Sequence, residues 1–120
     1  VIYADHQAAH SPPADCIVDT LLTIGCRTFL IDTFDKSKGN VLHHLSRAAI
    51  ANLNDQIEQQ DGVLVLAGSI TSIILADILQ TGAKYIGIRG AVCVGDRQNQ
   101  LSQTATISFL SSLKLLSSGI

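Results

Sequence analysis

The 120-residue sequence has no methionine and no tryptophan, and only 4% of its residues are aromatic. Charged residues are also scarce, at 15%, and the eight Lys and Arg side chains are scattered without forming a basic stripe. Because this distribution offers no footprint for a phosphate backbone, we expect no nucleic-acid partner. No apolar run approaches the roughly 20 residues that a membrane span needs, so we expect no membrane association either.

Cysteine is also rare, and Cys16, Cys26 and Cys93 are an odd number without paired spacing, which argues against a disulfide framework. Cys16 and Cys26 fall on elements expected in the core, where cysteine behaves as a small apolar side chain. Reduced thiols of this kind indicate a cytoplasmic protein. Apolar residues are plentiful, at 47%, which is enough for the core of one small domain and too many for a disordered chain.

Apolar runs and helical periodicity alternate along the chain. Strands are predicted at residues 1–4, 27–31, 63–67 and 84–88. Helices are predicted from Ser11-Pro12-Pro13 to Gly25 with Ser11 as N-cap, over 41–59, over 70–80 up to Gly82, and over 104–116. Loops are predicted at 33–40 and at 95–100, the second with an exposed pair, Asp96 and Arg97. Since the first strand would be buried and no initiator methionine is present, we expect further chain upstream.

Strands that are apolar throughout and separated by helices indicate an α/β protein with a parallel sheet covered by helices. Two architectures share this order of elements. One is a small open doubly wound sheet, and the other is four of the eight units of a (β/α)8 barrel, whose usual length is about 250 residues. The chain is close to half that length.

The active site of a parallel α/β protein lies at the carboxyl ends of the strands. Asp32 and Lys36 follow the second predicted strand, four residues apart on one loop. They are our candidate catalytic pair, because a carboxylate beside an amine can move protons around a carbonyl substrate. The alternative is a salt bridge within the loop or a helix-capping Asp. Asp35 and Lys38 on the same loop are expected to be solvated charges.

Two later strand ends carry glycine, as Gly68-Ser69 and Arg89-Gly90. Glycine lets the backbone approach a ligand closely, and the N-terminus of the following helix offers free N–H groups, so we predict a phosphate site there. In barrels the phosphate often binds after strands seven and eight. The alternative is that Gly68 only shapes a turn and Ser69 only caps a helix, with Arg89 in a structural ion pair.

Asp5 and His6 follow the first strand and would also lie at the mouth of a barrel. They could share a metal ion with His10, but no Cys or Glu completes such a site, so we expect no metal. His43 and His44 are adjacent on a predicted helix and therefore point in different directions. We expect them to face solvent or to cap an element.

Four blocks of sequence together resemble one known family. They are Tyr3-Ala4-Asp5-His6, Leu30-Ile31-Asp32-Thr33-Phe34-Asp35-Lys36-Ser37, Leu66-Ala67-Gly68-Ser69 and Ile86-Gly87-Ile88-Arg89-Gly90-Ala91-Val92-Cys93. In this order, and over nearly the whole chain, they are similar to the (5-formylfuran-3-yl)methyl phosphate synthase family, also called 4-(hydroxymethyl)-2-furancarboxaldehyde-phosphate synthases. The Asp-Thr-x-x-Lys and Ile-Arg-Gly-Ala-Val-Cys blocks are specific together, whereas either alone is weak.

The resemblance implies a (β/α)8 TIM barrel in which residues 1–120 are a single partial domain, strands five to eight with their helices. It implies a carbon-oxygen lyase that joins two molecules of glyceraldehyde 3-phosphate, with loss of phosphate and water, to a furan aldehyde phosphate used for methanofuran. The family mechanism is similar to that of class I aldolases and uses a Schiff-base lysine and no cofactor. Asp32 would act in acid/base steps, and Lys36 would assist proton transfer or hold a substrate oxygen. The substrate phosphate would be held by Gly68, Ser69, Arg89 and Gly90, a placement that rests on barrel geometry more than on a family motif.

The family's Schiff-base lysine and another catalytic lysine belong to the N-terminal half, which has no counterpart in this sequence. Lys36 is not that position, Lys84 begins its strand on the far side from the mouth, and Lys114 is on the last helix. We therefore expect the isolated chain to be inactive unless the missing half, or a second copy of the chain, completes the barrel. The alternatives are a non-catalytic half-barrel remnant or interaction module, and another phosphate-binding barrel enzyme such as an isomerase or decarboxylase.

Overall fold

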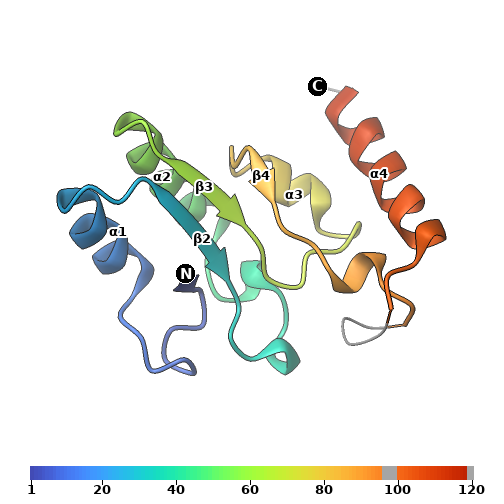
Figure 1. Cartoon of the computed structure of the whole chain (residues 1–120), viewed down its shortest axis with the longest axis horizontal. Helices are drawn as coiled ribbons and strands as arrows, with labels where there is room; N and C mark the ends of the chain where they lie inside the picture. Colours follow the sequence, from blue (N-terminus) through green and yellow to red (C-terminus); the bar gives the residue numbers. More distant parts are fainter. Residues whose placement is uncertain (96–99, 119–120) are drawn as a thin grey trace.

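A parallel sheet with helices organises the computed structural model, which describes residues 1–95 and 100–118 (Figure 1). The strands are β1 (Ile2–Tyr3), β2 (Thr28–Asp32), β3 (Val63–Leu66) and β4 (Tyr85–Ile86). The α-helices are α1 (Ala14–Thr23), α2 (Arg47–Gln59), α3 (Leu75–Leu79) and α4 (Gln103–Ser118), and the short 3-10 helices are η1 (Lys36–Lys38), η2 (Val41–His43) and η3 (Gly90–Val92). The predicted α/β class is confirmed.

The strands pair in parallel in the order β1-β2-β3-β4, so that each strand lies beside its neighbour in sequence. A doubly wound sheet has a point at which the strand order reverses. The strands of the described residues have no such point, which sets this sheet apart from the open doubly wound alternative. The predicted loop pair, Asp96 and Arg97, lies outside the described residues.

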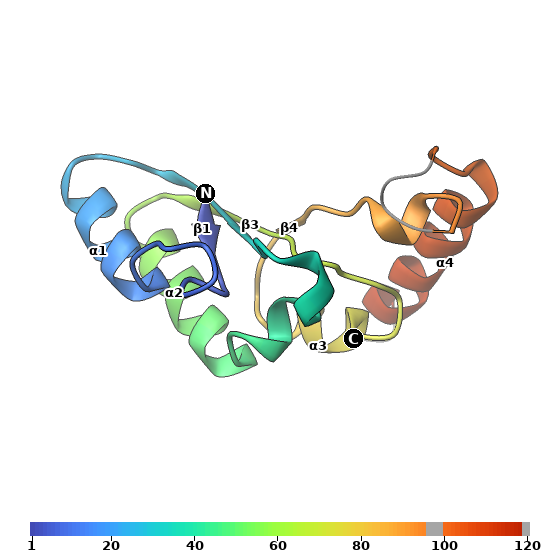
Figure 2. The same ribbon diagram turned by 90° about the horizontal axis from the view of Figure 1, so that it is seen from below.

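The two faces of the sheet differ in what covers them. Phe29, Ile31, Leu64 and Leu66 alternate toward the helices and are at most 3% exposed. Figure 2 shows α1, α2 and α3 together on that side of the strands. The alternate residues of the same strands point to the opposite face, where Leu30 pairs with Val65 and Val65 pairs with Tyr85. Tyr85 is 56% exposed. Parallel sheets are normally covered on both faces. In the described residues, helices cover only one face of this sheet.

Helix α1 begins later than predicted, because Pro13 and not Ser11 is its N-cap residue. A residue that precedes proline is kept out of the helical region, so Pro12 cannot start a helix before Pro13. The Ser11 hydroxyl is buried without a hydrogen-bond partner, and its assignment as the cap was wrong. The predicted stop at Gly25 is confirmed, since its N–H donates to the Leu22 carbonyl with a φ of 95°.

The second predicted helix, 41–59, is in fact two elements, η2 and α2. The Asn40 side chain accepts from the Leu42 N–H while the His43 ring accepts from the Asn40 N–H, which closes η2 as a unit of its own. Helix α2 then starts afresh with the Ser46 hydroxyl as its cap. The third predicted helix was also too long. Residues 70–74 are not helical, and α3 covers only Leu75–Leu79.

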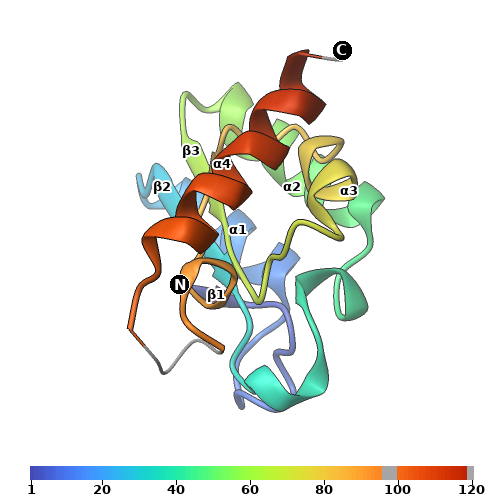
Figure 3. The same cartoon turned by 90° about the vertical axis from the view of Figure 1, so that its right-hand side faces the viewer.

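Helix α4 lies beyond β4 and crosses that end of the molecule (Figure 3). Phe109, at 4% exposure, is its buried anchor, and Ile107, Leu110 and Leu115 are exposed. No helix of the described ranges is long and apolar enough to cross a bilayer.

Of the two cysteines expected in the core, Cys26 is half-buried against it and Cys16 is exposed. Cys16 faces away from the buried stripe of α1, formed by Ala14, Val18 and Leu22, so its placement in the core was wrong. Cys93, for which no burial was predicted, is buried.

Candidate active site

A cavity of about 520 Å³ opens at the carboxyl ends of β2, β3 and β4. Its lining includes all six residues assigned to catalysis or phosphate binding from the sequence, namely Asp32, Lys36, Gly68, Ser69, Arg89 and Gly90. They come from three strand-exit segments that are far apart in sequence, and the parallel pairing of the strands brings them to one edge of the sheet.

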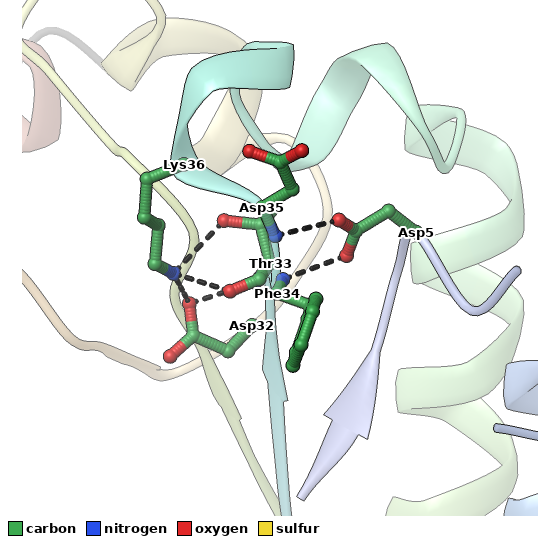
Figure 4. A network of polar contacts seen from close by, with 6 residues as sticks. All are labelled: Asp5, Asp32, Thr33, Phe34, Asp35 and Lys36. Atoms are coloured by element: carbon green, nitrogen blue, oxygen red, sulfur yellow. Dashed lines mark hydrogen bonds and ion pairs between the residues drawn. The ribbon is translucent and has the colours of Figure 1, made fainter. Parts of the chain in front are cut away.

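Asp32 and Lys36 form an ion pair within this cavity (Figure 4). The Lys36 Nζ lies 2.6 Å from Asp32 Oδ1 and 2.9 Å from Thr33 Oγ1, and it also donates to the Thr33 carbonyl. The Lys36 side chain is 25% exposed and the Asp32 side chain is 30% exposed, so both remain accessible from the cavity. Thr33 itself is only 2% exposed. The sequence reading assigned no role to Thr33, although it is part of the Asp-Thr-x-x-Lys block.

Asp5 lies on the other side of the same loop and does not line this cavity. Its carboxylate accepts the Phe34 N–H at 2.7 Å and the Asp35 N–H at 2.9 Å, and the residue is 8% exposed. Burial raises the pKa of the Asp5 carboxyl, but its hydrogen bonds with the backbone of Phe34, Asp35 and Asp5 itself, together with nearby His44, outweigh burial, so the pKa lies below its usual value.

Asp35 caps η1 and is therefore more than a solvated charge. Its carboxylate accepts the Ser37 hydroxyl at 2.6 Å and the Ser37 N–H at 3.0 Å. These bonds lower the pKa of the Asp35 carboxyl. Lys38 is exposed, in line with its prediction as a solvated charge.

Gly68 is required at its position by both its backbone angle and its surroundings. Its φ of 118° is unfavourable for an L residue. A Cβ atom there would lie 2.9 Å from the Val41 Cβ and 3.0 Å from the Thr33 Cγ2. Its carbonyl accepts the Val41 N–H at 2.9 Å. Gly68 thus lets the β3 exit pack closely against the β2 exit loop, as well as lining the cavity.

One argument for the phosphate site was wrong, because no helix follows Gly68-Ser69 directly. Ser69 has a φ of 54° and is exposed, and α3 begins only at Leu75, with Ile74 as its N-cap residue. Neither the helix N-terminus behind Ser69 nor its capping role is present. After Arg89-Gly90, by contrast, a short helix does follow, because η3 begins at Gly90 with Arg89 as its N-cap residue. Among the described residues that line the cavity, Lys36 and Arg89 are the two cationic side chains and Asp32 is the acidic one.

Asp5 and three of the four histidines belong to a different cavity, of about 480 Å³, lined by Asp5, His6, Lys38, His43 and His44 among others. His6 Nδ1 lies 3.2 Å from the Ser11 carbonyl oxygen, and His43 has the predicted capping role. The His44 Nε2 is buried without a hydrogen-bond partner. Within residues 1–95 and 100–118, no three His, Cys, Asp or Glu side chains are grouped so as to hold a metal ion.

Neither of the two distant lysines lines the first cavity. Lys84 lies before β4, at the amino end of the sheet, where its Nζ is 3.6 Å from Glu58 Oε1. Lys114 is an exposed residue of α4. The predicted positions of both lysines are confirmed. In the part of the chain that the structure describes, Lys36 is therefore the lysine of this site.

A family model described as 4-HFC-P synthase matches residues 1–109. Because this match covers most of the chain, the chain belongs to that family, and the resemblance of the four sequence blocks is confirmed. The family is one of synthases, which makes the chain part of an enzyme family. A search of curated proteins found no match.

Proposed function

We propose that the chain is the C-terminal half of a (β/α)8-barrel lyase that condenses two molecules of glyceraldehyde 3-phosphate to (5-formylfuran-3-yl)methyl phosphate. The observation that carries this proposal is the shared cavity of the Asp32–Lys36 pair and the Arg89-Gly90 segment. A pair that moves protons beside a further cationic side chain, Arg89, suits a phosphorylated carbonyl substrate. Membership of the 4-HFC-P synthase family supports the same reaction.

The uncovered face of the sheet supports the half-barrel part of the proposal. In a closed barrel the side chains of Leu30, Val65 and Tyr85 would point into the interior. There they would pack in layers against side chains from the other strands. The order β1-β2-β3-β4, with α1 to α3 on one side, is the order in which barrel units follow one another. The remaining units would come from further chain of the same protein or from a second polypeptide.

The atom balance of this reaction makes proton transfer its main demand. Two triose phosphates hold six carbons and two phosphates, whereas the product holds six carbons and one phosphate, so one phosphate and two water molecules leave. One carbon–carbon bond forms after a proton leaves the carbon next to a carbonyl, and the attacked carbonyl oxygen gains a proton. The ring carbon–oxygen bond forms when a hydroxyl group adds to a second carbonyl carbon, and the hydroxyl proton moves to that carbonyl oxygen. Each elimination then removes a further proton from the carbon skeleton while a C–O bond breaks.

We assign these proton transfers to Asp32, with Lys36 as its partner. The Lys36 ammonium has three oxygen acceptors around it, so it is arranged to donate hydrogen bonds and to replace one of them with a substrate oxygen. A nucleophilic amine needs a free electron pair, and we therefore place the Schiff-base lysine outside residues 1–120. No cofactor is needed for this chemistry. Arg89, Gly90, Gly68 and Ser69 would hold a substrate phosphate, and the product would serve the synthesis of a methanofuran-type carrier in the cytoplasm.

Borohydride trapping of the complete enzyme with glyceraldehyde 3-phosphate tests the proposal. We expect a furan aldehyde phosphate in the untreated reaction. In the treated one we expect a reduced adduct on a lysine outside this segment, located by peptide mass spectrometry. The absence of both, with turnover of a different phosphosugar, would identify another barrel enzyme instead. The isolated chain should give neither product nor adduct.

The uncovered face also favours a second candidate, a non-catalytic half barrel that binds a second copy of itself through that face. Sedimentation of the 120-residue chain separates the two. A stable dimer that protects Tyr85 from solvent would support the second candidate. A chain that associates only with an added N-terminal half would support the lyase.

A further inference from the structure

We infer that Asp5 is a positioning residue that holds the loop between Asp32 and Lys36 in its working shape. This inference rests on the proposed function, because it assigns Asp5 a part in preparing that site. The sequence placed Asp5 among the possible residues of the barrel mouth. Its contacts point to a different task.

Both oxygens of the Asp5 carboxylate are already engaged. Oδ1 accepts the Phe34 N–H at 2.7 Å, and Oδ2 accepts the Asp35 N–H at 2.9 Å. The residue is buried and lies on the opposite side of the loop from the Lys36 ammonium (Figure 4). A carboxylate in this position does not reach a substrate in the first cavity, so its effect must pass through the loop.

The loop is short enough for two anchored N–H groups to fix its path. Phe34 and Asp35 lie directly between Thr33 and Lys36, and the Lys36 ammonium must fold back over both to reach Asp32 Oδ1. A second contact from β1 acts in the same direction, since the Tyr3 ring meets the Phe34 ring edge-on with centroids 5.4 Å apart. The Ala4 N–H also donates to the Asp32 carbonyl at 2.9 Å. The exit of β1 thus clamps the segment that carries the catalytic pair.

Replacing Asp5 with asparagine tests the clamp, because the amide retains one acceptor and turns a donor toward a backbone N–H. The matched control is Asp15→Asn, which also removes a carboxylate that accepts a backbone N–H, from Cys16, but on the exposed first turn of α1. Both variants are made in the complete enzyme. The first readout is the extent to which an amine-reactive reagent labels Lys36 relative to Lys38, and the second is kcat and KM for glyceraldehyde 3-phosphate.

In Asp5→Asn we expect the labelling of Lys36 relative to Lys38 to rise roughly tenfold, as the loss of one charged hydrogen bond would allow. We expect kcat to fall about 10- to 100-fold with KM nearly unchanged, since a misplaced catalytic pair slows the reaction more than binding. Asp15→Asn should change neither quantity.

An unchanged labelling ratio in folded Asp5→Asn would overturn the inference, even if activity fell, because Asp5 would then only stabilise the fold. A raised ratio in an enzyme that does not convert glyceraldehyde 3-phosphate would leave the clamp standing and remove the proposed reaction. If Asp5→Asn does not fold, an acid titration of the wild-type enzyme followed by NMR tests the inference instead. On acidification, the amide protons of Phe34 and Asp35 must shift together with the Lys36 side-chain signals, and independent shifts would contradict the clamp.

Discussion

Gly68→Ala probes the packing that joins the two sides of the candidate active-site cavity. Its Cβ would lie 2.9 Å from the Val41 Cβ and 3.0 Å from the Thr33 Cγ2, and both atoms belong to buried residues with little room to move. Overpacking of this kind typically costs about 1–3 kcal/mol. The φ of 118° adds strain of about 1–2 kcal/mol for an L residue. We therefore expect the free energy of unfolding to fall by about 2–5 kcal/mol, the sum of these two effects.

Gly25→Ala is the matched control, because Gly25 also has a positive φ, of 95°, but a Cβ there would meet no atom within 4 Å. It should lose only the strain energy, about 1–2 kcal/mol. Urea unfolding with unchanged slopes measures both losses. Because Thr33 holds the Lys36 ammonium, Gly68→Ala should also lower kcat, while Gly25→Ala should not. Equal losses of stability in the two variants would refute the packing role of Gly68.

Three further predictions concern single side chains. Asp32→Asn and Lys36→Ala should each lower kcat of the complete enzyme by about 10²–10⁴-fold with unchanged circular dichroism, and wild-type rates would remove their assigned roles. Folding lowers the pKa of Asp5, so the ionised carboxylate stabilises the fold fully above the ordinary pKa of 3.8, and this stabilisation is lost as pH falls through the lower folded value. The difference in unfolding free energy between wild type and Asp5→Asn should therefore disappear in acid. Ser46→Ala should cost about 1 kcal/mol as the loss of the α2 cap, whereas Ser11→Ala removes a hydroxyl without a partner and should be neutral in the same urea titration.

The fold was predictable where the pattern of apolar residues along the chain is distinctive. Apolar runs at 27–31 and 63–67 mark the two longest strands to within one residue at each end, since a buried parallel strand has few polar positions. The boundaries of α2 were not predictable from periodicity, because the apolar spacing continues through 41–59. The break depends on hydrogen bonds of Asn40 and His43 with each other and of Ser46 with the α2 N-terminus.

The candidate site was predictable from the rule that parallel strands bring their carboxyl ends together. That rule predicts Asp32, Lys36 and Arg89 at the same edge of the sheet, and in the structure all three line one cavity there. The role of Asp5 was beyond the same rule. Its partners lie 29 and 30 residues along the chain, and its side chain turns toward the neighbouring loop, which only the packing of β1 beside β2 determines.

We propose that the cavity at the ends of β2, β3 and β4 belongs to a lyase that acts on glyceraldehyde 3-phosphate through Asp32. Turnover of that substrate by the complete wild-type enzyme and by Asp32→Asn, followed by the absorbance and mass of the furan aldehyde phosphate, tests it most directly. We expect product from the wild type and a roughly 100-fold or still slower reaction in the variant. No furan product from the wild type, or equal rates in the two proteins, would contradict it.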